Sequence, residues 1–172
     1  MNGSVKQVEQ LIKNMNEAKL SGNTGESKVC LPCVFPRKCR SLERVLVFAE
    51  VVIAPPALYL LSASKQVEAP IQVSAQNCHT AECGAFTGEI APAQLKDASI
   101  PWVIIGHSER RQMFGDTHEF VAEKTKAAVE AGLKVILCIG ETLDERKADK
   151  TDEVCQGQLK AVVDVLDKKA WT

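Results

Sequence analysis

The chain has 172 residues, with 21 basic and 22 acidic side chains, a formal net charge of −1 and 45% hydrophobic residues. This length permits a substantial core, and the balanced charge excludes a general attraction to nucleic acid or an anionic membrane. The sequence shows no signal peptide and no apolar run of the roughly 20 residues that span a bilayer, so we expect a cytoplasmic protein. An odd number of cysteines, seven, favours reduced thiols.

Strands and helices are expected to alternate along the chain. An amphipathic helix is predicted after Ser4, its N-cap, because apolar residues recur at helical spacing. Apolar runs predict buried strands at residues 50–54, 71–75, 102–106 and 134–139. Helical patterns follow the first two strands at 57–65 and 92–97. A third helix is expected to begin at a capping box formed by Asp116 and Glu119 and to end at Gly132, and a last helix is expected to begin at Thr151. This order indicates an α/β protein of parallel β/α units, with ligand chemistry at the carboxyl ends of its strands.

The segment 27–49 interrupts this alternation, with five basic residues against one acidic residue. The spacing of Cys30 and Cys33 suits zinc or a dithiol, but a zinc site needs more ligands. Cys39 is the next cysteine along the chain and has no histidine nearby. Cys78, His79 and Cys83 could complete a zinc site only if the fold brings them next to this segment. The basic cluster Arg37, Lys38 and Arg40 lacks aromatic partners for nucleic acid. We favour a solvated basic loop and predict no metal, no cofactor and no nucleic-acid partner.

A histidine follows the third predicted strand directly. His107 comes after Gly106 and is followed by Ser108 and Glu109, near an expected helix start. Backbone N–H groups there disfavour a charged imidazole, and a neutral ring can donate a hydrogen bond to a substrate carbonyl. A histidine that only satisfies local backbone groups remains the alternative.

Four segments of the chain resemble the triosephosphate isomerase family. They are WVIIGHSERR at 102–111, AQNC at 75–78, GAFTGEI at 84–90 and CIGETL at 138–143, in the family's order. The resemblance covers nearly all of the chain except 27–49. It implies a single, partial TIM-barrel domain over 1–172, with about four of the eight strands and a non-family insertion at about 27–49.

The resemblance also implies roles for individual residues. The family interconverts glyceraldehyde 3-phosphate and dihydroxyacetone phosphate without a cofactor, and His107 would polarise the substrate carbonyl with Ser108 in support. Glu109 would orient the family's active-site lysine. Arg110 and Arg111 are expected in ion pairs behind the site. Asp116 stands where the family has glutamate, a shortening expected to loosen the ion-pair network beside it.

The loop 76–89 resembles the family's dimer loop, which reaches into a second subunit. It implies a homodimer held through Gln76, Asn77, Gly84, Phe86, Thr87, Gly88 and Glu89. Gly84 and Gly88 are also explained by a tight turn that needs positive φ, and both explanations can hold together. Cys138, within an apolar run, is expected to be a packed core thiol.

Other parts of the family's active site have no counterpart in this sequence. The family's lysine precedes the Met1-Asn2-Gly3 segment, and its general base, lid and phosphate loops follow the segment that ends in Trp171 and Thr172. We therefore expect negligible isomerase activity and a sheet whose outer strands are unpaired. A splice or gene-model variant would explain these differences. The alternative is a non-catalytic variant that associates with a complete protomer through the 76–89 loop.

Overall fold

The computed structural model describes residues 4–18, 50–167 and 170. The predicted insertion at 27–49, with Cys30, Cys33 and the basic cluster, lies outside this part. None of the helices in the described ranges is both long and apolar enough to cross a bilayer.

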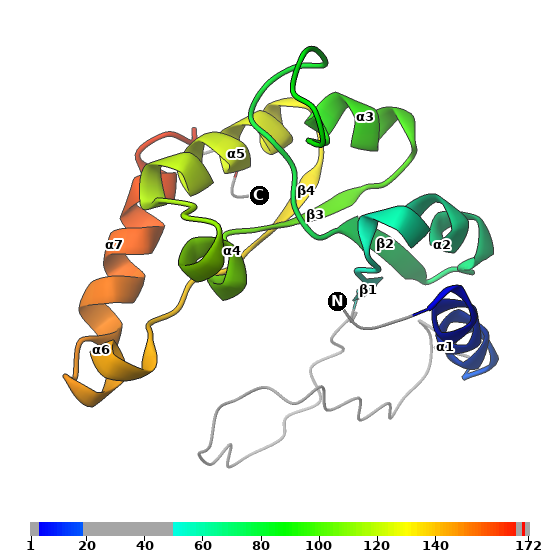
Figure 1. Ribbon diagram of the computed structural model, residues 1–172, viewed down its shortest axis with the longest axis horizontal. Helices are drawn as coiled ribbons and strands as arrows, with labels where there is room; N and C mark the ends of the chain where they lie inside the picture. The colour runs from blue at the N-terminus through cyan, green and yellow to red at the C-terminus, as the bar shows by residue number, and fades with distance from the viewer. Residues whose placement is uncertain (1–3, 19–49, 168–169, 171–172) are drawn as a thin grey trace, which may run out of the picture.

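Four parallel strands form one sheet in the order β1-β2-β3-β4 (Figure 1). Their bounds are Val51–Ile53 (β1), Ile71–Ala75 (β2), Trp102–Ile105 (β3) and Lys134–Leu137 (β4). Each strand pairs in parallel with the next one along the chain, as in a series of consecutive β/α units. The predicted α/β class is confirmed.

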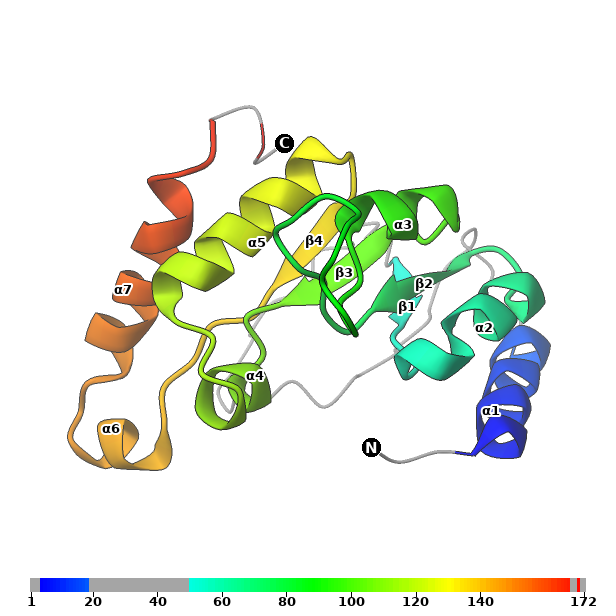
Figure 2. The same ribbon diagram turned by 45° about the horizontal axis from the view of Figure 1, so that its top comes forward.

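The helices form layers outside the sheet. In chain order they are α1 (Val5–Glu17), η1 (Ala57–Tyr59), α2 (Leu60–Gln66), α3 (Pro92–Asp97), α4 (Ser108–Met113), α5 (His118–Glu130), α6 (Leu143–Lys147) and α7 (Thr151–Val163). The helix α2 packs on β2, and α5 packs on β3 and β4. Farther out, α1 packs against α2 and α7 packs against α5 (Figure 2).

An ion pair between the two outermost strands shows that the sheet is curled. Glu50 immediately precedes β1 and Lys134 begins β4, yet their Oε1 and Nζ atoms are 3.1 Å apart. A flat sheet would hold these strands about 14 Å apart, with side chains pointing out of the sheet rather than across it. The described strands therefore form half of a barrel, which confirms the incomplete TIM barrel implied by the family resemblance.

The core lies between the sheet and the helices that cover it. Its buried members include Leu60, Val73, Leu95, Ile100, Val103, Ile105, Val121 and Ala128. The strands β1 and β4 contribute less than predicted, since all three residues of β1 are half-buried and β4 has one exposed and three half-buried residues. The expectation of buried strands is wrong for both, because each is an edge strand that pairs on one side alone within the described residues.

Most predicted helix boundaries are confirmed. Ser4 caps α1 by accepting the Gln7 N–H, and Pro92 occupies the first turn of α3. Gly132, with φ of 77°, ends the α5 segment. The helix start expected near His107 is confirmed by α4, whereas the short helix α6 is not among the predicted elements.

The predicted capping box of Asp116 and Glu119 is wrong. The N-cap of α5 is Thr117, whose hydroxyl accepts the N–H of Phe120. Asp116 is buried, with 5% of its surface exposed, and its carboxylate accepts hydrogen bonds from Lys124 and Arg110. A buried carboxylate needs charged partners, so those bonds take precedence over capping.

Candidate active site

His107 lies at the carboxyl end of β3, where it is the N-cap of α4. Its Nδ1 accepts the N–H of Glu109 at 3.3 Å. In a neutral imidazole this leaves the proton on Nε2, so Nε2 is the hydrogen-bond donor. The side chain is 47% exposed, so this donor is available to a ligand.

Gly106 permits the sharp change of direction between β3 and His107. Its φ is +79°, and a Cβ at this position would lie 2.8 Å from Arg111 Nη2 and 2.9 Å from the Cys138 carbonyl oxygen. Real Cβ atoms almost never approach other atoms so closely. Both the backbone conformation and the lack of space therefore require glycine.

Ser108 and Glu109 follow on the first turn of α4 and are exposed. Glu109 Oε2 lies 3.7 Å from His107 Nδ1. Among the described residues, no lysine forms an ion pair with Glu109. The predicted role of Glu109 in orienting a lysine stays a prediction.

A buried ion cluster lies behind the histidine. Asp116 accepts hydrogen bonds from Lys124 Nζ at 2.7 Å and from Arg110 Nε and Nη2 at 3.3 and 3.2 Å. Burial opposes ionisation of Asp116, but the hydrogen bonds from Lys124 and Arg110 outweigh it and lower the pKa of this carboxyl. The expected loosening by aspartate is not seen in these contacts, since both carboxylate oxygens have partners.

The cluster also reaches the 76–89 loop. Lys124 Nζ donates to Asn77 Oδ1 at 3.4 Å and lies 4.3 Å from the centre of the Phe120 ring. Cys78 is buried beside it, and that burial raises the pKa of its thiol to about 11, although Lys124 acts in the opposite direction. Lys124 thus joins α5, the segment after α4 and the base of the loop.

The 76–89 loop projects away from the sheet (Figures 1 and 2). Its base is closed by a hydrogen bond from the His79 N–H to the Ile90 carbonyl at 2.9 Å. Within the loop, the rings of His79 and Phe86 lie 5.1 Å apart. From Cys83 to Glu89 every residue is exposed, including Thr87.

The two loop glycines have different backbone conformations. Gly88 has φ of +90°, which favours glycine. Gly84 is not among the glycines with positive φ, so the tight-turn explanation is confirmed for Gly88 and wrong for Gly84. A Cβ on Gly84 would meet only the Phe86 ring, at 3.7 Å.

Of the two predicted ion-pair arginines, only Arg110 has an acidic partner among the described residues. Arg111 instead donates to the carbonyl oxygens of Gly106 and Cys138. The prediction is wrong for Arg111 because Asp116 is already occupied by Arg110 and Lys124. Cys138 is half-buried rather than fully packed, and burial raises the pKa of its thiol.

Two positioning residues escaped the sequence prediction. Lys124 lies on the buried face of α5 with Val121 and Thr125, so a charge on an apolar face was the available signal. Gln158 of α7 accepts the Gly140 N–H and donates to the Gly140 carbonyl, both at 2.9 Å. A single glutamine in a helical pattern offers no signal for this role.

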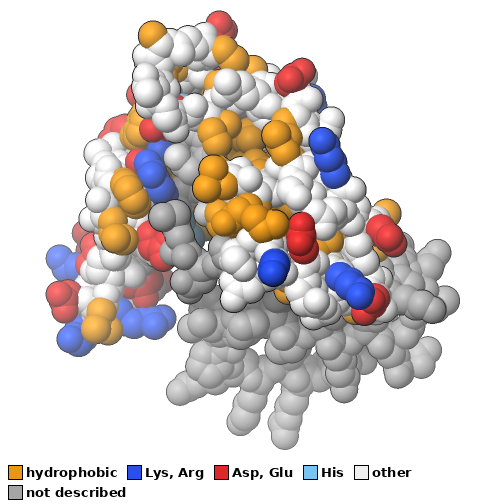
Figure 3. Space-filling view, turned by 45° about the vertical axis from the view of Figure 1, so that its right-hand side comes forward, with side chains coloured by type: hydrophobic (Ala, Val, Ile, Leu, Met, Phe, Trp, Pro, Cys, Tyr) orange, Lys and Arg blue, Asp and Glu red, His pale blue; other side chains and the backbone are white. Residues whose placement is uncertain are grey.

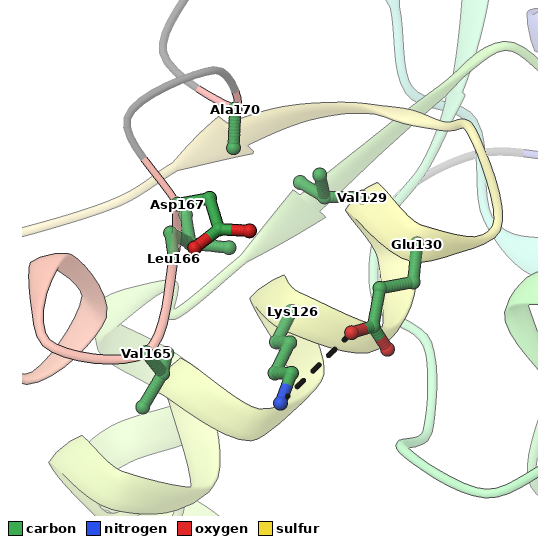
Figure 4. Close-up of a pocket in the computed structure, with 7 residues that line it drawn as sticks. All are labelled: Lys126, Val129, Glu130, Val165, Leu166, Asp167 and Ala170. Carbon is green, nitrogen blue, oxygen red and sulfur yellow. Dashed lines mark ion pairs between the residues drawn. The ribbon is translucent and has the colours of Figure 1, made fainter.

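The described residues contain no group of three or more His, Cys, Asp or Glu side chains that could hold a metal. Cys78, Cys83, Cys138 and Cys155 are free thiols. A hollow of ≈ 230 Å³ lies elsewhere, between α5 and the segment after α7, where Lys126 and Glu130 form an ion pair across 3.9 Å (Figure 4). None of its lining residues belongs to the candidate site.

Comparison with known proteins gives one consistent result. The sequence model of the family described as "Triosephosphate isomerase" matches residues 38–172. A triosephosphate isomerase from Aspergillus oryzae is 45% identical over 174 aligned residues, covering 100% of this chain and 59% of the relative. A triosephosphate isomerase from Coprinopsis cinerea is 57% identical over 123 residues, which cover 72% of this chain and 49% of the relative. A triosephosphate isomerase from Emericella nidulans is 44% identical over 171 residues, which cover 99% of this chain and 59% of the relative. The chain therefore spans less than two thirds of the length of these relatives.

Proposed function

Because the chain belongs to the triosephosphate isomerase family, we propose that His107 and its neighbours form one side of an active site for triose phosphates. The reaction is the interconversion of glyceraldehyde 3-phosphate and dihydroxyacetone phosphate. The observation that carries this proposal is the bond from the Glu109 N–H to His107 Nδ1, which leaves an exposed Nε2–H as a donor.

A neutral imidazole suits the electrophilic step of this isomerisation. A base removes a proton from the carbon next to the substrate carbonyl, and negative charge develops on the carbonyl oxygen. The Nε2–H of His107 donates a hydrogen bond to that oxygen and stabilises the charge as it forms. The same ring can then pass a proton between the two substrate oxygens. Ser108 and Glu109 flank the imidazole in this arrangement.

The described residues offer poor candidates for the base. The carboxylates that closely follow β3 and β4 are Glu109 and Glu141. Glu141 accepts hydrogen bonds from Arg146 Nε at 2.9 Å and Thr151 Oγ1 at 3.2 Å. Its own backbone N–H, together with those side chains, lowers the pKa of Glu141, which makes it a weaker base. We therefore propose that the 172-residue chain by itself isomerises triose phosphates at a negligible rate.

An isomerisation assay tests the proposed lack of a base and the negligible rate that follows from it. The purified chain and its His107→Asn variant are compared, at equal concentration, for conversion of glyceraldehyde 3-phosphate. We expect the two rates to be equal within error, because an electrophile without a base gives little catalysis. Turnover by the unmodified chain well above that of the variant contradicts the proposed lack of a base.

A second function is favoured by the exposed loop and by apolar residues elsewhere. Phe86 in the loop is 50% exposed, and Leu58 in η1 is 90% exposed. Figure 3 shows hydrophobic side chains gathered on the side of the molecule that carries η1 and α2. These features support a non-catalytic variant that associates with a complete protomer through the 76–89 loop.

Co-purification tests this second function. A tagged chain is mixed with a complete triosephosphate isomerase and recovered through the tag. Capture of the enzyme by the unmodified chain, and its loss in Phe86→Ser, is the expected result. A chain that stays monomeric and captures nothing contradicts it. Phe114→Ser, an exposed aromatic residue outside the loop, is the matched control.

A further inference from the structure

Arg111 bridges the carboxyl ends of two neighbouring strands. Its Nε donates to the Gly106 carbonyl at 2.7 Å, and its Nη2 donates to the Cys138 carbonyl at 3.1 Å. Gly106 follows β3 and Cys138 follows β4. One side chain of α4 therefore fixes two strand ends from which functional loops begin.

The anchor at β4 is itself held in place. The Cys138 N–H donates to the Ile105 carbonyl at 2.8 Å, which continues the pairing of β3 and β4. Two residues farther on, the amide of Gln158 bonds both the N–H and the carbonyl of Gly140. Gln158 belongs to α7 and is only 4% exposed. Arg111 thus connects the end of β3 to the segment 138–140, which is hydrogen-bonded to α7 through Gln158.

The anchor at β3 controls the orientation of His107. The Gly106 carbonyl belongs to the planar peptide unit that also contains the backbone nitrogen of His107. Rotation of this peptide plane, which would swing the imidazole, breaks the 2.7 Å bond to Arg111. The guanidinium also fills the space beside the Gly106 Cα, where a Cβ would lie 2.8 Å from Nη2.

Packing alone does not account for an arginine at this position. Arg111 Nη1 is buried and has no hydrogen-bond partner among the described residues. Burial lowers the pKa of Arg111, although Cys138 and Asp116 act in the opposite direction. An uncharged side chain of similar length would avoid both costs but could not donate to two carbonyls.

We propose that Arg111 is a positioning residue that fixes the peptide between Gly106 and His107 and thereby orients the imidazole. This rests on the proposed role of His107 as the electrophile. Arg110, one residue earlier on the same helix, bonds Asp116 and does not touch the Gly106 carbonyl. The two adjacent arginines therefore serve different purposes, one for the cluster behind the site and one for the site itself.

The test follows the His107 ring by NMR in the ¹⁵N-labelled 172-residue chain. Long-range ¹H–¹⁵N spectra show which ring nitrogen carries the proton, and His107→Asn assigns the signal among the three histidines. We expect the Nε2–H tautomer in the unmodified chain. In Arg111→Met we expect a mixture of tautomers and about tenfold faster hydrogen exchange of the Glu109 amide. Arg110→Met is the matched control and should leave both readouts unchanged.

The indole N–H of Trp102, which bonds Gln72 Oε1 at 2.8 Å, reports whether each variant remains folded. Unchanged His107 and Glu109 signals in a folded Arg111→Met protein overturn the proposal. If that variant unfolds, the scalar coupling between Arg111 Nε–H and the Gly106 carbonyl carbon in the unmodified chain decides, and its absence overturns the proposal. A chain without the Trp102 signal also overturns it, because the anchored strands are then absent. None of these readouts depends on turnover, so the isomerase proposal can fail separately.

Discussion

The carboxyl ends of β3 and β4 and the start of β1 are held in place by different contacts. Beyond β3 and β4, buried or half-buried charged groups bond a carboxylate and backbone carbonyls, as in the pair of Lys124 and Asp116 at 2.7 Å. At the start of β1, the charged contact is Glu50 with Lys134, the first residue of β4, and both side chains are about half exposed. Geometry is therefore specified most tightly where His107 lies.

This difference follows from the physics of buried polar groups. A buried ion needs particular partners at particular distances, so it permits few alternative arrangements. Exposed pairs exchange their partners for water at little cost. The polar link from α1 to the rest of the protein is of the second kind, since Asn16 Nδ2 donates to the Gln66 carbonyl at 2.9 Å at an exposed position, while Ile12 of the same helix is buried in the core. The comparison predicts large effects near β3 and β4 and small effects near β1.

The largest effect is expected for Lys124→Met. Removal of the ammonium leaves the buried Asp116 without its closest partner, so the free energy of unfolding should fall by roughly 3–5 kcal/mol. Urea denaturation followed by circular dichroism measures this change.

Lys126→Met on the same helix is the matched control. Lys126 pairs with Glu130 across 3.9 Å, and both side chains are more than half exposed. Its loss should cost at most about 0.5 kcal/mol. Equal losses in the two variants would show that the buried cluster is not a principal determinant of stability.

Gly106→Ala should be the next most damaging change. The new methyl group combines a left-handed backbone strain with contacts at 2.8 and 2.9 Å, so we expect a loss of about 3 kcal/mol in unfolding free energy. Gly88→Ala shares the positive φ but has nothing within 4 Å, and it should cost only about 1–2 kcal/mol. Thermal unfolding of both variants decides whether the close contacts at Gly106 matter.

A smaller effect is expected from pH. The pKa of Asp116 in the folded protein lies below its ordinary value of 3.8, so the charged form stabilises the fold above that pH. This contribution is lost as the pH falls from about 4 through the lowered pKa of the folded state. Denaturation at pH 6 and pH 3 should show a smaller decline in Asp116→Asn than in the unmodified chain. An identical decline in both proteins argues against ionised Asp116 in the fold.

A small effect is also expected for Glu50→Gln beside β1. The ion pair with Lys134 is exposed, so the unfolding free energy should change by no more than about 1 kcal/mol. A loss as large as that in Lys124→Met would mean that the curl of the sheet depends on this one contact. That result would contradict the expectation that substitutions near β1 have small effects.

The sequence predicted the elements with strong local signals. The strand β2 and the helix α3 agree with their predicted bounds because β-branched residues, Pro92 and flanking polar residues mark them locally. The short helices α4 and α6 have too few turns to show an apolar period. Asp116 was assigned to a cap because its partner Lys124 lies on the next helix, and sequence spacing does not reveal burial.

The candidate site was predicted only in part for the same reason. His107 was found because a histidine after a buried strand and a glycine occupies a recognisable place in α/β proteins. The bond from Arg111 to the Cys138 carbonyl joins residues 27 positions apart, so only the fold reveals it. The residues that orient a site are harder to predict than those that react, because their partners are backbone atoms without a sequence signature.

The most direct test of the proposed electrophile supplies the base from solution. Acetate in D₂O slowly exchanges the carbon-bound protons of dihydroxyacetone phosphate, and ¹H NMR follows their loss. At equal acetate concentration, the unmodified chain should accelerate this exchange beyond the rate seen with His107→Asn, because Nε2–H stabilises the charge that acetate creates. Equal exchange rates with the two proteins would contradict the proposed role of His107.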